Sequence, residues 1–351
     1  MFERFYRAFS TDIGIDLGTS NTLIYVKGLG VVLTEPSIVA VNQKTGRVVA
    51  VGSEAKLMVG RTPAHIEAIK PLVNSVISNF EVAEEMISYF IRRAGEISGK
   101  KFFRSQVIVS VPTGITNVER RAVRDAIHNA GASFIHIVEV PMAAALGIRL
   151  PVHDPVGSMV IDIGGGTTDI AVVSLGGIVR SKNLPIAGDK MNQDIIAYIR
   201  DEFKILLGEK TAEEVKLAIG SVYKDVGEAR EATVRGRDLV TGLPREVVIT
   251  DADIREAISH STSLLVDAIK EVLETTPPEV VSDVMRRGIV MVGGGAQIRG
   301  LKELLEKELQ MPIHIDDEPH TAVIRGAGVI LEKIEDYREI LIDNEDDLPP
   351  R

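Results

Sequence analysis

The stretch VIDIGGGTTDIAVV, residues 160–173, decides the fold class of this chain, because it repeats a pattern that occurs earlier. The first copy is DIGIDLGTSNTLIYV, residues 12–26. In each copy a β-rich run contains an aspartate near its end, a turn with glycine and hydroxyl residues follows, and a second apolar run begins at once. Each copy therefore predicts a β-hairpin, and the pair predicts one ligand held from two sides.

The composition is typical of a globular α/β protein. The chain has 351 residues, of which 45% are hydrophobic and 26% are charged, enough for two domains. Its net charge of -10 argues against the phosphate backbone of a nucleic acid as a partner. It contains no cysteine, which excludes disulfides and thiolate metal sites. Since the sequence has neither an apolar run of about 18 residues nor a signal-peptide core, we expect a cytoplasmic protein.

Short β-rich runs alternate with helical patterns, which favours an α/β architecture. Strands are predicted at residues 12–17, 22–27, 31–33, 106–111, 134–138, 159–163, 169–175, 178–184 and 288–292. Helices are predicted at residues 82–94, 117–130, 191–207, 254–273 and 301–309.

The two copies lie about 150 residues apart, too far for a solenoid repeat. We therefore expect two related domains, residues 1–145 and 146–332, that face each other across a cleft. Residues 34–73 and 188–250 are expected to form inserted subdomains. Residues 333–351 are expected to return to the first domain and to end in an acidic, disordered tail.

The first motif has the residue types of an anion-binding turn. Asp16 ends a strand, Gly18 opens a tight turn, and the N–H groups of Thr19, Ser20 and Asn21 then converge on one point. A carboxylate beside a phosphate needs a cation between them, so Asp16 is a candidate Mg²⁺ ligand. A plain hairpin turn remains the alternative for this motif taken alone.

The second motif repeats this chemistry with more glycine. Its turn consists of Gly164, Gly165, Gly166, Thr167 and Thr168. Three consecutive glycines lose much conformational entropy on folding, so they indicate a close approach to the backbone. We expect a second phosphate-binding turn, with Asp162 as the second carboxylate at the cation; the alternative is a glycine-rich bulge.

A third motif, GIVMVGGGAQIRGL at residues 288–301, predicts a strand, a glycine turn and a helix. Its open backbone could admit a base or a ribose beside Gly293, Gly294, Gly295 and Ala296. A simple tight turn would have the same sequence.

A fourth segment, KTAEEVKLAIG at residues 210–220, predicts a helix that begins with a capping box from Thr211 to Glu214. Glu213 and Lys216 then share one helix face. A solvated ion pair is the simplest interpretation of that pairing.

Together these motifs resemble the superfamily of actin, the large heat-shock chaperones and the sugar kinases, and within it most closely the MreB family of bacterial actin-like rod-shape proteins. Further similar segments are EPSIVA (35–40), GRTPAHIEAIKPL (60–72), FEVAEEMISYFI (80–91), VPMAAALG (140–147), LPREVVIT (243–250) and PPEVVSDV (277–284). The resemblance implies duplicated actin-like (ribonuclease H-like) α/β domains with ATP and Mg²⁺ between them. It implies that the phosphates lie at Thr19, Ser20, Asn21 and at residues 164–167, the adenosine at residues 293–296, and the ribose or base at Glu213, Glu214 and Lys216.

One position departs from the family pattern. The family has a water-positioning glutamate immediately before the proline of PMAAA, where this chain has Val140. The neighbouring Glu139 is the other candidate, but it points to the opposite face if the segment is extended. Because a positioned base contributes about 10²–10⁴ in rate, we expect slow hydrolysis, with residual turnover supported by Thr167 and Asp162.

Two segments suggest contact with a membrane. In MFERFYRAF, Phe2, Phe5 and Phe9 share a face of a short amphipathic helix, opposite basic residues; packing of these phenylalanines on the core is the alternative. In GKKFFR, Phe102 and Phe103 stand between basic residues, as in a membrane-contacting loop of the related family.

The resemblance also implies partners. It predicts a homopolymer of double antiparallel protofilaments on the inner surface of the cell membrane, working with cell-wall elongation proteins and without nucleic acid. A small-molecule, sugar-type kinase would use the same phosphate turns but needs a catalytic aspartate in a sugar site. A chaperone would need a further substrate domain, and a binding module without nucleotide would leave the glycine motifs unexplained.

Overall fold

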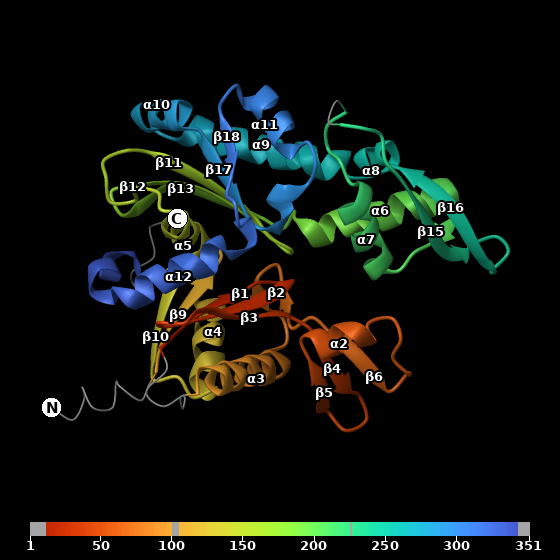
Figure 1. Cartoon of the computed structure of the whole chain (residues 1–351), viewed down its shortest axis with the longest axis horizontal. Coiled ribbons are helices and arrows are strands. Elements are labelled where there is room, and N and C mark those ends of the chain that lie inside the picture. Colours follow the sequence, from red (N-terminus) through yellow and green to blue (C-terminus); the bar gives the residue numbers. More distant parts are fainter. Residues whose placement is uncertain (1–11, 100–104, 225–226, 343–351) are drawn as a thin grey trace.

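The computed structural model describes residues 12–99, 105–224 and 227–342. It consists of two halves, each built on a five-stranded sheet, and Figure 1 shows helices α5 (Val140–Gly147) and α12 (Ala322–Glu332) between the two sheets. Of the helices in these ranges, none is both long enough and apolar enough to span a membrane. The predicted membrane-contacting residues Phe2, Phe5, Phe9, Phe102 and Phe103 lie outside the described residues.

The first sheet has the strand order β10-β9-β1-β2-β3. Its strands are β1 (Ile13–Leu17), β2 (Asn21–Val26), β3 (Gly30–Pro36), β9 (Gln106–Val111) and β10 (Phe134–Glu139). Strands β1, β2 and β3 form an antiparallel meander, and β9 and β10 add to the other side of β1 in parallel. The alternating residues Ile13, Ile15 and Leu17 of β1 are buried in the core of this half.

The second sheet repeats this topology in the order β13-β12-β11-β17-β18. Its strands are β11 (Ser158–Ile163), β12 (Thr168–Ser174), β13 (Gly177–Leu184), β17 (Ile289–Val292) and β18 (Ile313–Ile315). Again three strands form an antiparallel meander and two add in parallel beside the first. The duplication predicted from the two motifs is therefore confirmed at the level of strand order and direction.

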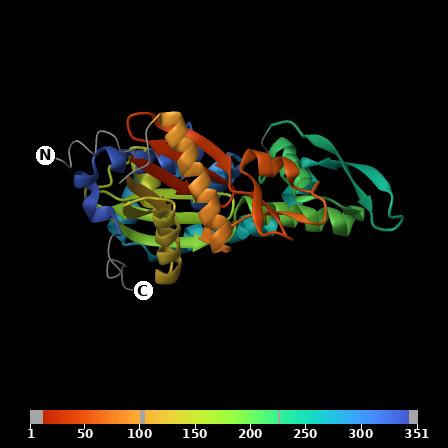
Figure 2. The same ribbon diagram turned by 90° about the horizontal axis from the view of Figure 1, so that it is seen from below.

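Helices cover the outer faces of both sheets. Helices α3 (Phe80–Ser98) and α4 (Asn117–Asn129) cross the first sheet, as Figure 2 shows from below. The side chain of Asn79 caps α3, whose buried face includes Met86 and Phe90. The second half carries α9 (Ser259–Thr275), α10 (Pro278–Arg287) and α11 (Leu301–Leu309).

Each half also carries a smaller sheet on the right-hand side of Figure 1. In the first half this part contains β4 (Val39–Asn42), β5 (Arg47–Val51), β6 (Ile66–Ile69) and α2 (Ser53–Met58), followed by the hairpin of β7 (Leu72–Val73) and β8 (Val76–Ile77). In the second half it contains α6 (Gly188–Phe203), β14 (Ile205–Leu206), α7 (Glu209–Ile219), β15 (Glu231–Asp238), β16 (Pro244–Thr250) and α8 (Asp251–Ala257).

Three helix predictions need correction. The helix expected at 191–207 ends at Phe203, because Lys204 takes a left-handed conformation (φ 58°) and the chain continues as β14. The helix expected at 254–273 is two helices that meet at Ile258. Thr211 does not cap α7, which begins two residues earlier, after Gly208.

Helices α5 and α12 connect the two halves by crossing over. Helix α5 follows β10 of the first sheet but packs on β11 and β12 of the second, whereas α12 follows β18 and packs on β1 and β9 of the first. Where they cross, a Cβ on Gly147 would overlap the Ala322 carbonyl, and a Cβ on Gly326 would overlap the Ala143 carbonyl. The two backbones are therefore in direct contact, which glycine alone permits.

Candidate functional site

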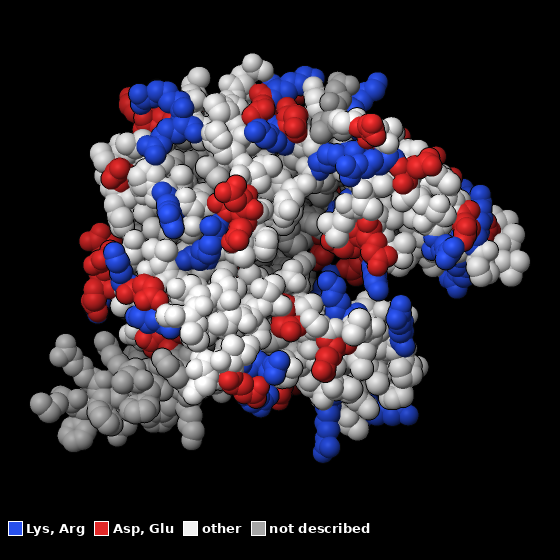
Figure 3. All heavy atoms as spheres, viewed as in Figure 1, with Lys and Arg blue, Asp and Glu red and all other residues white. Residues whose placement is uncertain are grey.

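A cavity of about 550 Å³ lies between the two sheets, at the ends of β1 and β11. Both glycine turns line it, together with residues from the hairpin β7–β8, from α6 and α7, and from the segment that precedes α12. Figure 3 shows the molecular surface notched on the right between the two halves, with acidic and basic side chains meeting at the mouth of the notch.

The first turn, between β1 and β2, is held in a fixed shape by hydrogen bonds. The N–H of Gly18 donates to the Asn21 carbonyl at 3.1 Å, and the Ser37 hydroxyl donates to the Gly18 carbonyl at 2.7 Å. The cavity lining includes Thr19, Ser20 and Asn21, as the sequence motif suggested.

The second turn, between β11 and β12, is closed by a bond from the Gly164 N–H to the Thr167 carbonyl at 2.9 Å. Its carbonyls also accept hydrogen bonds from the first turn of α6, where the Asp189 N–H donates to the Gly165 carbonyl at 2.7 Å. The orientation of α6 is therefore coupled directly to the position of the glycine turn.

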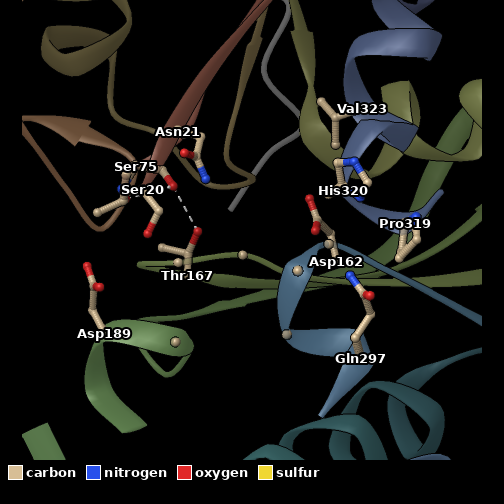
Figure 4. A pocket seen from close by; sticks show the side chains of 18 of the residues that line it. Ser20, Asn21, Ser75, Asp162, Thr167, Asp189, Gln297, Pro319, His320 and Val323 are labelled. Carbon is tan, nitrogen blue, oxygen red and sulfur yellow. Dashed lines mark hydrogen bonds between the residues drawn. The ribbon is translucent and has the colours of Figure 1, made fainter. Parts of the chain in front are cut away.

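The two turns face each other closely enough that side chains fit on one side only. A Cβ on Gly165 would overlap the Ser20 hydroxyl, and a Cβ on Gly166 would overlap that of Thr19. Figure 4 shows Ser20 and Thr167 on opposite sides of this gap. The hydroxyl side chains of the first turn thus explain Gly165 and Gly166, whereas a Cβ on Gly164 would meet only the Thr167 carbonyl, at 3.2 Å.

Three carboxyl groups lie at the base of the cavity; Asp169 is buried, and Asp16 and Asp162 are partly exposed. Burial raises the pKa of Asp16 to about 6, although the Ser110 hydroxyl, which donates to it at 2.7 Å, acts to lower it. Burial and the nearby charges of Asp16 and Asp169 raise the pKa of Asp162 well above its ordinary value. Burial also raises the pKa of Asp169. These groups repel one another as anions, so a cation between Asp16 and Asp162 would stabilise the charged forms.

Such a cation site would rest on few protein ligands. Within the described ranges, His, Asp and Glu side chains form no group of three or more with metal-binding geometry. Two carboxylates that share a cation with phosphate oxygens and water are the usual arrangement for Mg²⁺, so the two aspartates fit that ion.

The other end of the cavity combines open backbone with a polar cluster. A Cβ on Gly293 (φ 80°) would overlap both the Asp162 carboxylate and the Ile163 carbonyl. Across from it, the Glu213 carboxylate accepts from Asn192 at 2.5 Å and from Lys216 at 2.7 Å, and Lys216 also donates to the Gly188 carbonyl at 2.9 Å. Burial acts to raise the pKa of Glu213, but the charge of Lys216 and these hydrogen bonds hold that pKa below its ordinary value. This carboxylate is therefore a fixed, charged hydrogen-bond acceptor.

Most of the residues expected at the site line the cavity. They are Asp16, Gly18, Thr19, Ser20, Asn21, Asp162, Gly164, Gly165, Thr167, Glu213, Lys216, Gly293, Gly294 and Gly295. Four others lie outside the lining: a Cβ on Gly166 would overlap Thr19, Ala296 is buried, Glu214 is exposed beside Lys210, and Glu139 precedes the first residue of α5.

Val140 and Glu139 stand at the point where β10 ends and α5 begins, so the segment is extended only as far as Glu139. Val140 lines the cavity, whereas Glu139 ends β10 and lies near Asp169. Burial and the charge of Asp169 raise the pKa of Glu139 to about 7.

Several lining residues were not found from the sequence. They include Ser75, Ser110, Asp189, Arg230, Gln297, Arg299 and His320. Ser75 stands in the turn Val-Asn-Ser-Val, which lacks the Asn-Gly pair typical of a tight hairpin and so gave no signal. The others reach the cavity through tertiary packing.

Comparison with known proteins gives a consistent result. The model of the MreB/Mbl protein family matches residues 10–339 of this chain. The cell shape-determining protein Mbl of Bacillus subtilis (strain 168) is 45% identical over 343 residues, covering 98% of this chain and 99% of the relative. The cell shape-determining protein MreB of Escherichia coli (strain K12) is 46% identical over 341 residues, covering 95% and 97%.

Solved structures agree with this. Crystal structures of MreB5 of Spiroplasma citri, bound to ADP and to AMPPNP, superpose with a TM-score of 0.89 at 39% identity, and cover 94% of this chain and 98% of theirs. The fold expected from the two motifs is thereby confirmed.

Proposed function

This chain belongs to the MreB/Mbl protein family, and from that premise we propose that it is an ATP-binding, actin-like cytoskeletal protein. We propose that it polymerises into membrane-associated filaments that direct cell shape and cell-wall elongation. The observation that carries the nucleotide-binding part is the direct opposition of the two turns, with the hydroxyls of Ser20 and Thr19 set against Gly165 and Gly166.

The cavity suits a nucleoside triphosphate in size and chemistry. Its volume of about 550 Å³ lies within the usual range for small-molecule sites. Backbone N–H groups and hydroxyls of the two turns would hold the phosphates. The binding of ADP and AMPPNP by MreB5, at 39% identity over nearly the whole chain, supports the same ligand class here.

At the other end we propose that residues 293–295 leave room for the nucleoside and that Glu213 accepts hydrogen bonds from the ribose hydroxyls. Lys216 and Asn192 fix the Glu213 carboxylate through bonds of 2.7 and 2.5 Å, so its acceptor atoms are oriented before ligand arrives. Glu214 and Ala296, which the resemblance implied for the nucleoside, both lie outside the cavity lining.

Mg²⁺ is the cation that the donor set favours. Asp16 and Asp162 would hold it, directly or through water, and it would neutralise part of the phosphate charge. The chain's own contribution includes orienting the Asp16 carboxylate, to which the Ser110 hydroxyl donates at 2.7 Å.

We further propose that hydrolysis is slow. At the position of the water-positioning base the cavity has the apolar Val140, which can neither accept a proton nor orient water. Glu139 lies outside the lining. Thr167 and Asp162 remain to orient the bound ligand, which supports residual turnover only.

Family membership is the ground on which we also propose polymerisation, membrane contact and partners. We propose double antiparallel protofilaments at the inner membrane surface, attached through Phe2, Phe5, Phe9, Phe102 and Phe103, and working with cell-wall elongation proteins. The proposed domains are residues 1–145 and 146–332, with inserts near 34–73 and 188–250 and a C-terminal return at 333–351.

The test is sedimentation combined with phosphate release, measured with Mg-ATP at rising protein concentration and with or without anionic liposomes. We expect ATP-dependent pelleting, enrichment on liposomes and little phosphate release. Asp162→Asn is the matched control and should lose the ATP dependence. Absence of pelleting together with phosphate transfer to a sugar would replace the filament proposal with a kinase.

A further inference from the structure

The hairpin β7–β8 has an unusual turn. Its two central residues, Asn74 and Ser75, both have positive φ values, 51° and 61°. This geometry matches the twist of a two-residue hairpin, but it strains residues that carry a Cβ; asparagine tolerates it better than serine does. Strained backbone of this kind concentrates at functional sites, so the side chain of Ser75 requires an explanation.

Ser75 points into the cavity and contacts both phosphate-binding turns. Its N–H donates to the Thr19 hydroxyl at 2.8 Å, and its own hydroxyl lies 2.9 Å from that of Thr167 and 3.5 Å from that of Thr19. Figure 4 shows the bond to Thr167 crossing the gap between the two halves. Three hydroxyls from three separate segments therefore meet where the two turns come closest.

The chain segment that carries Ser75 makes a second contact across the cleft, through Lys70. Lys70, five residues before Ser75, forms ion pairs with Asp189 at 3.4 Å and with Glu209. Asp189 in turn donates its N–H to the Gly165 carbonyl of the second turn at 2.7 Å. The segment from Lys70 to Ser75 thus contacts the other half beside the phosphate-binding turn and again at the cleft mouth.

A hydroxyl in this place has two alternative partners. Either hydroxyl could be the donor in the bond between Ser75 and Thr167, and each has only one hydrogen to donate. A bond to a charged oxygen is about twice as strong as one to a neutral hydroxyl. A phosphate oxygen within reach would therefore draw the Ser75 hydrogen to itself, and Ser75 could no longer donate across the cleft to Thr167.

We propose that Ser75 is a specificity-determining residue that senses the terminal phosphate of a bound nucleoside triphosphate. Its hydroxyl donates to that phosphate, gives up its bond to Thr167, and so favours triphosphate over diphosphate. The backbone between Ser75 and Lys70 carries the change to the ion pairs at the cleft mouth. This inference rests on the proposed nucleotide-binding function.

The test compares Ser75→Gly with Asn74→Gly. Both substitutions relieve a positive φ, but only the first removes the hydroxyl, and Asn74 is exposed outside the cavity. Affinities for AMPPNP and ADP are measured by displacement of a fluorescent nucleotide. Thermal melting without nucleotide reports folding.

We expect Ser75→Gly to lose about tenfold of the preference for AMPPNP over ADP, the effect of one hydrogen bond to a charged group. Asn74→Gly should keep the wild-type ratio. Both variants should melt at or above the wild-type temperature, because glycine adopts this backbone conformation without strain.

Three outcomes would overturn the inference. An unchanged ratio in Ser75→Gly, with wild-type protein binding both nucleotides, rejects Ser75 as the sensor and leaves the proposed function intact. Equal changes in both variants assign the effect to turn geometry instead of the hydroxyl. Failure of the wild-type protein to bind either nucleotide rejects the proposed function as well.

Discussion

The two halves of this molecule share one strand order but present different chemistry to the cleft. The first half offers hydroxyl side chains at Thr19 and Ser20, and the second offers bare backbone at Gly165 and Gly166. Had both turns kept side chains, they could not approach closely; had both lost them, few donors would remain. Duplication supplied the scaffold, and divergence of the turns made the two halves complementary.

A similar difference exists where each sheet leads into its crossing helix. Strand β10 leads into α5 through Val140 and Pro141, and β18 leads towards α12 through Glu318 and Pro319. Only the first of these junctions places its residue before proline in the cavity lining. The residue before proline is thus acidic at Glu318, outside the cavity lining, and apolar at Val140, within it.

The largest expected effect comes from giving the inner junction an acidic residue. Val140→Glu should raise phosphate release by about 10²–10⁴, because it places a base where water can be positioned. The measurement is single-turnover hydrolysis at saturating Mg-ATP. Val118→Glu, at an exposed site on α4, is the control for added charge. An unchanged rate in Val140→Glu would mean that the valine does not limit hydrolysis.

The next effect concerns Glu139, whose pKa is raised from 4.5 to about 7 by burial and by Asp169. The folded state then holds this proton more tightly than the unfolded state does. The free energy of unfolding should therefore fall as pH rises from about 4.5 to about 7, by at most about 3 kcal/mol, and then level off.

Glu139→Gln removes this contribution, so the variant should gain stability relative to wild type as pH rises. Urea denaturation of nucleotide-free protein at pH 5 and pH 8 tests it. An equal difference between variant and wild type at both pH values would contradict the expected titration.

The complementarity of the turns can be broken by Gly165→Ala. The added methyl group would overlap the Ser20 hydroxyl and should weaken nucleotide binding by about 1–3 kcal/mol. Ser20→Gly in the same chain restores the space, so the double variant should bind better than the two single effects predict. Strict additivity would show that the turns do not compete for one space.

The smallest effect is expected at the cleft mouth. Lys70→Ala removes partly exposed ion pairs with Asp189 and Glu209, which should weaken nucleotide binding by about 1 kcal/mol or less at low salt, and by less still at high salt. Arg93→Ala, which removes an exposed ion pair with Glu96 on α3, is the matched control. A loss that is independent of salt would contradict an electrostatic contact.

The sequence predicted those features that local patterns determine. The paired hairpins, the duplicated sheets and limits such as residues 106–111 and 301–309 follow from apolar runs bounded by turn residues. Prediction from the sequence failed where tertiary contacts override local signals. Thr211 and Glu214 have capping-box spacing, yet α7 starts at Glu209, and Lys204 ends α6 although the apolar pattern continues.

The same distinction separates the site residues that the sequence predicted from those that it did not. Residues within the glycine motifs could be assigned because their unusual composition needs a reason. Ser75 and Asp189 could not, because each is an ordinary residue that reaches the cavity through the packing of a separate segment. Val140 was identified only because the resemblance supplied an expectation for that position.

The contact between α5 and α12 has a mechanical consequence. Packed side chains absorb small movements by changing rotamer, but the backbones that meet at Gly147 and Gly326 have no side chain with which to do so. A rotation of the two halves about this contact would therefore move the contact itself least and the cleft mouth, between Lys70 and Asp189, most. One methyl group at Gly326 would overlap the Ala143 carbonyl, so Gly326→Ala should disturb the position of both halves at once.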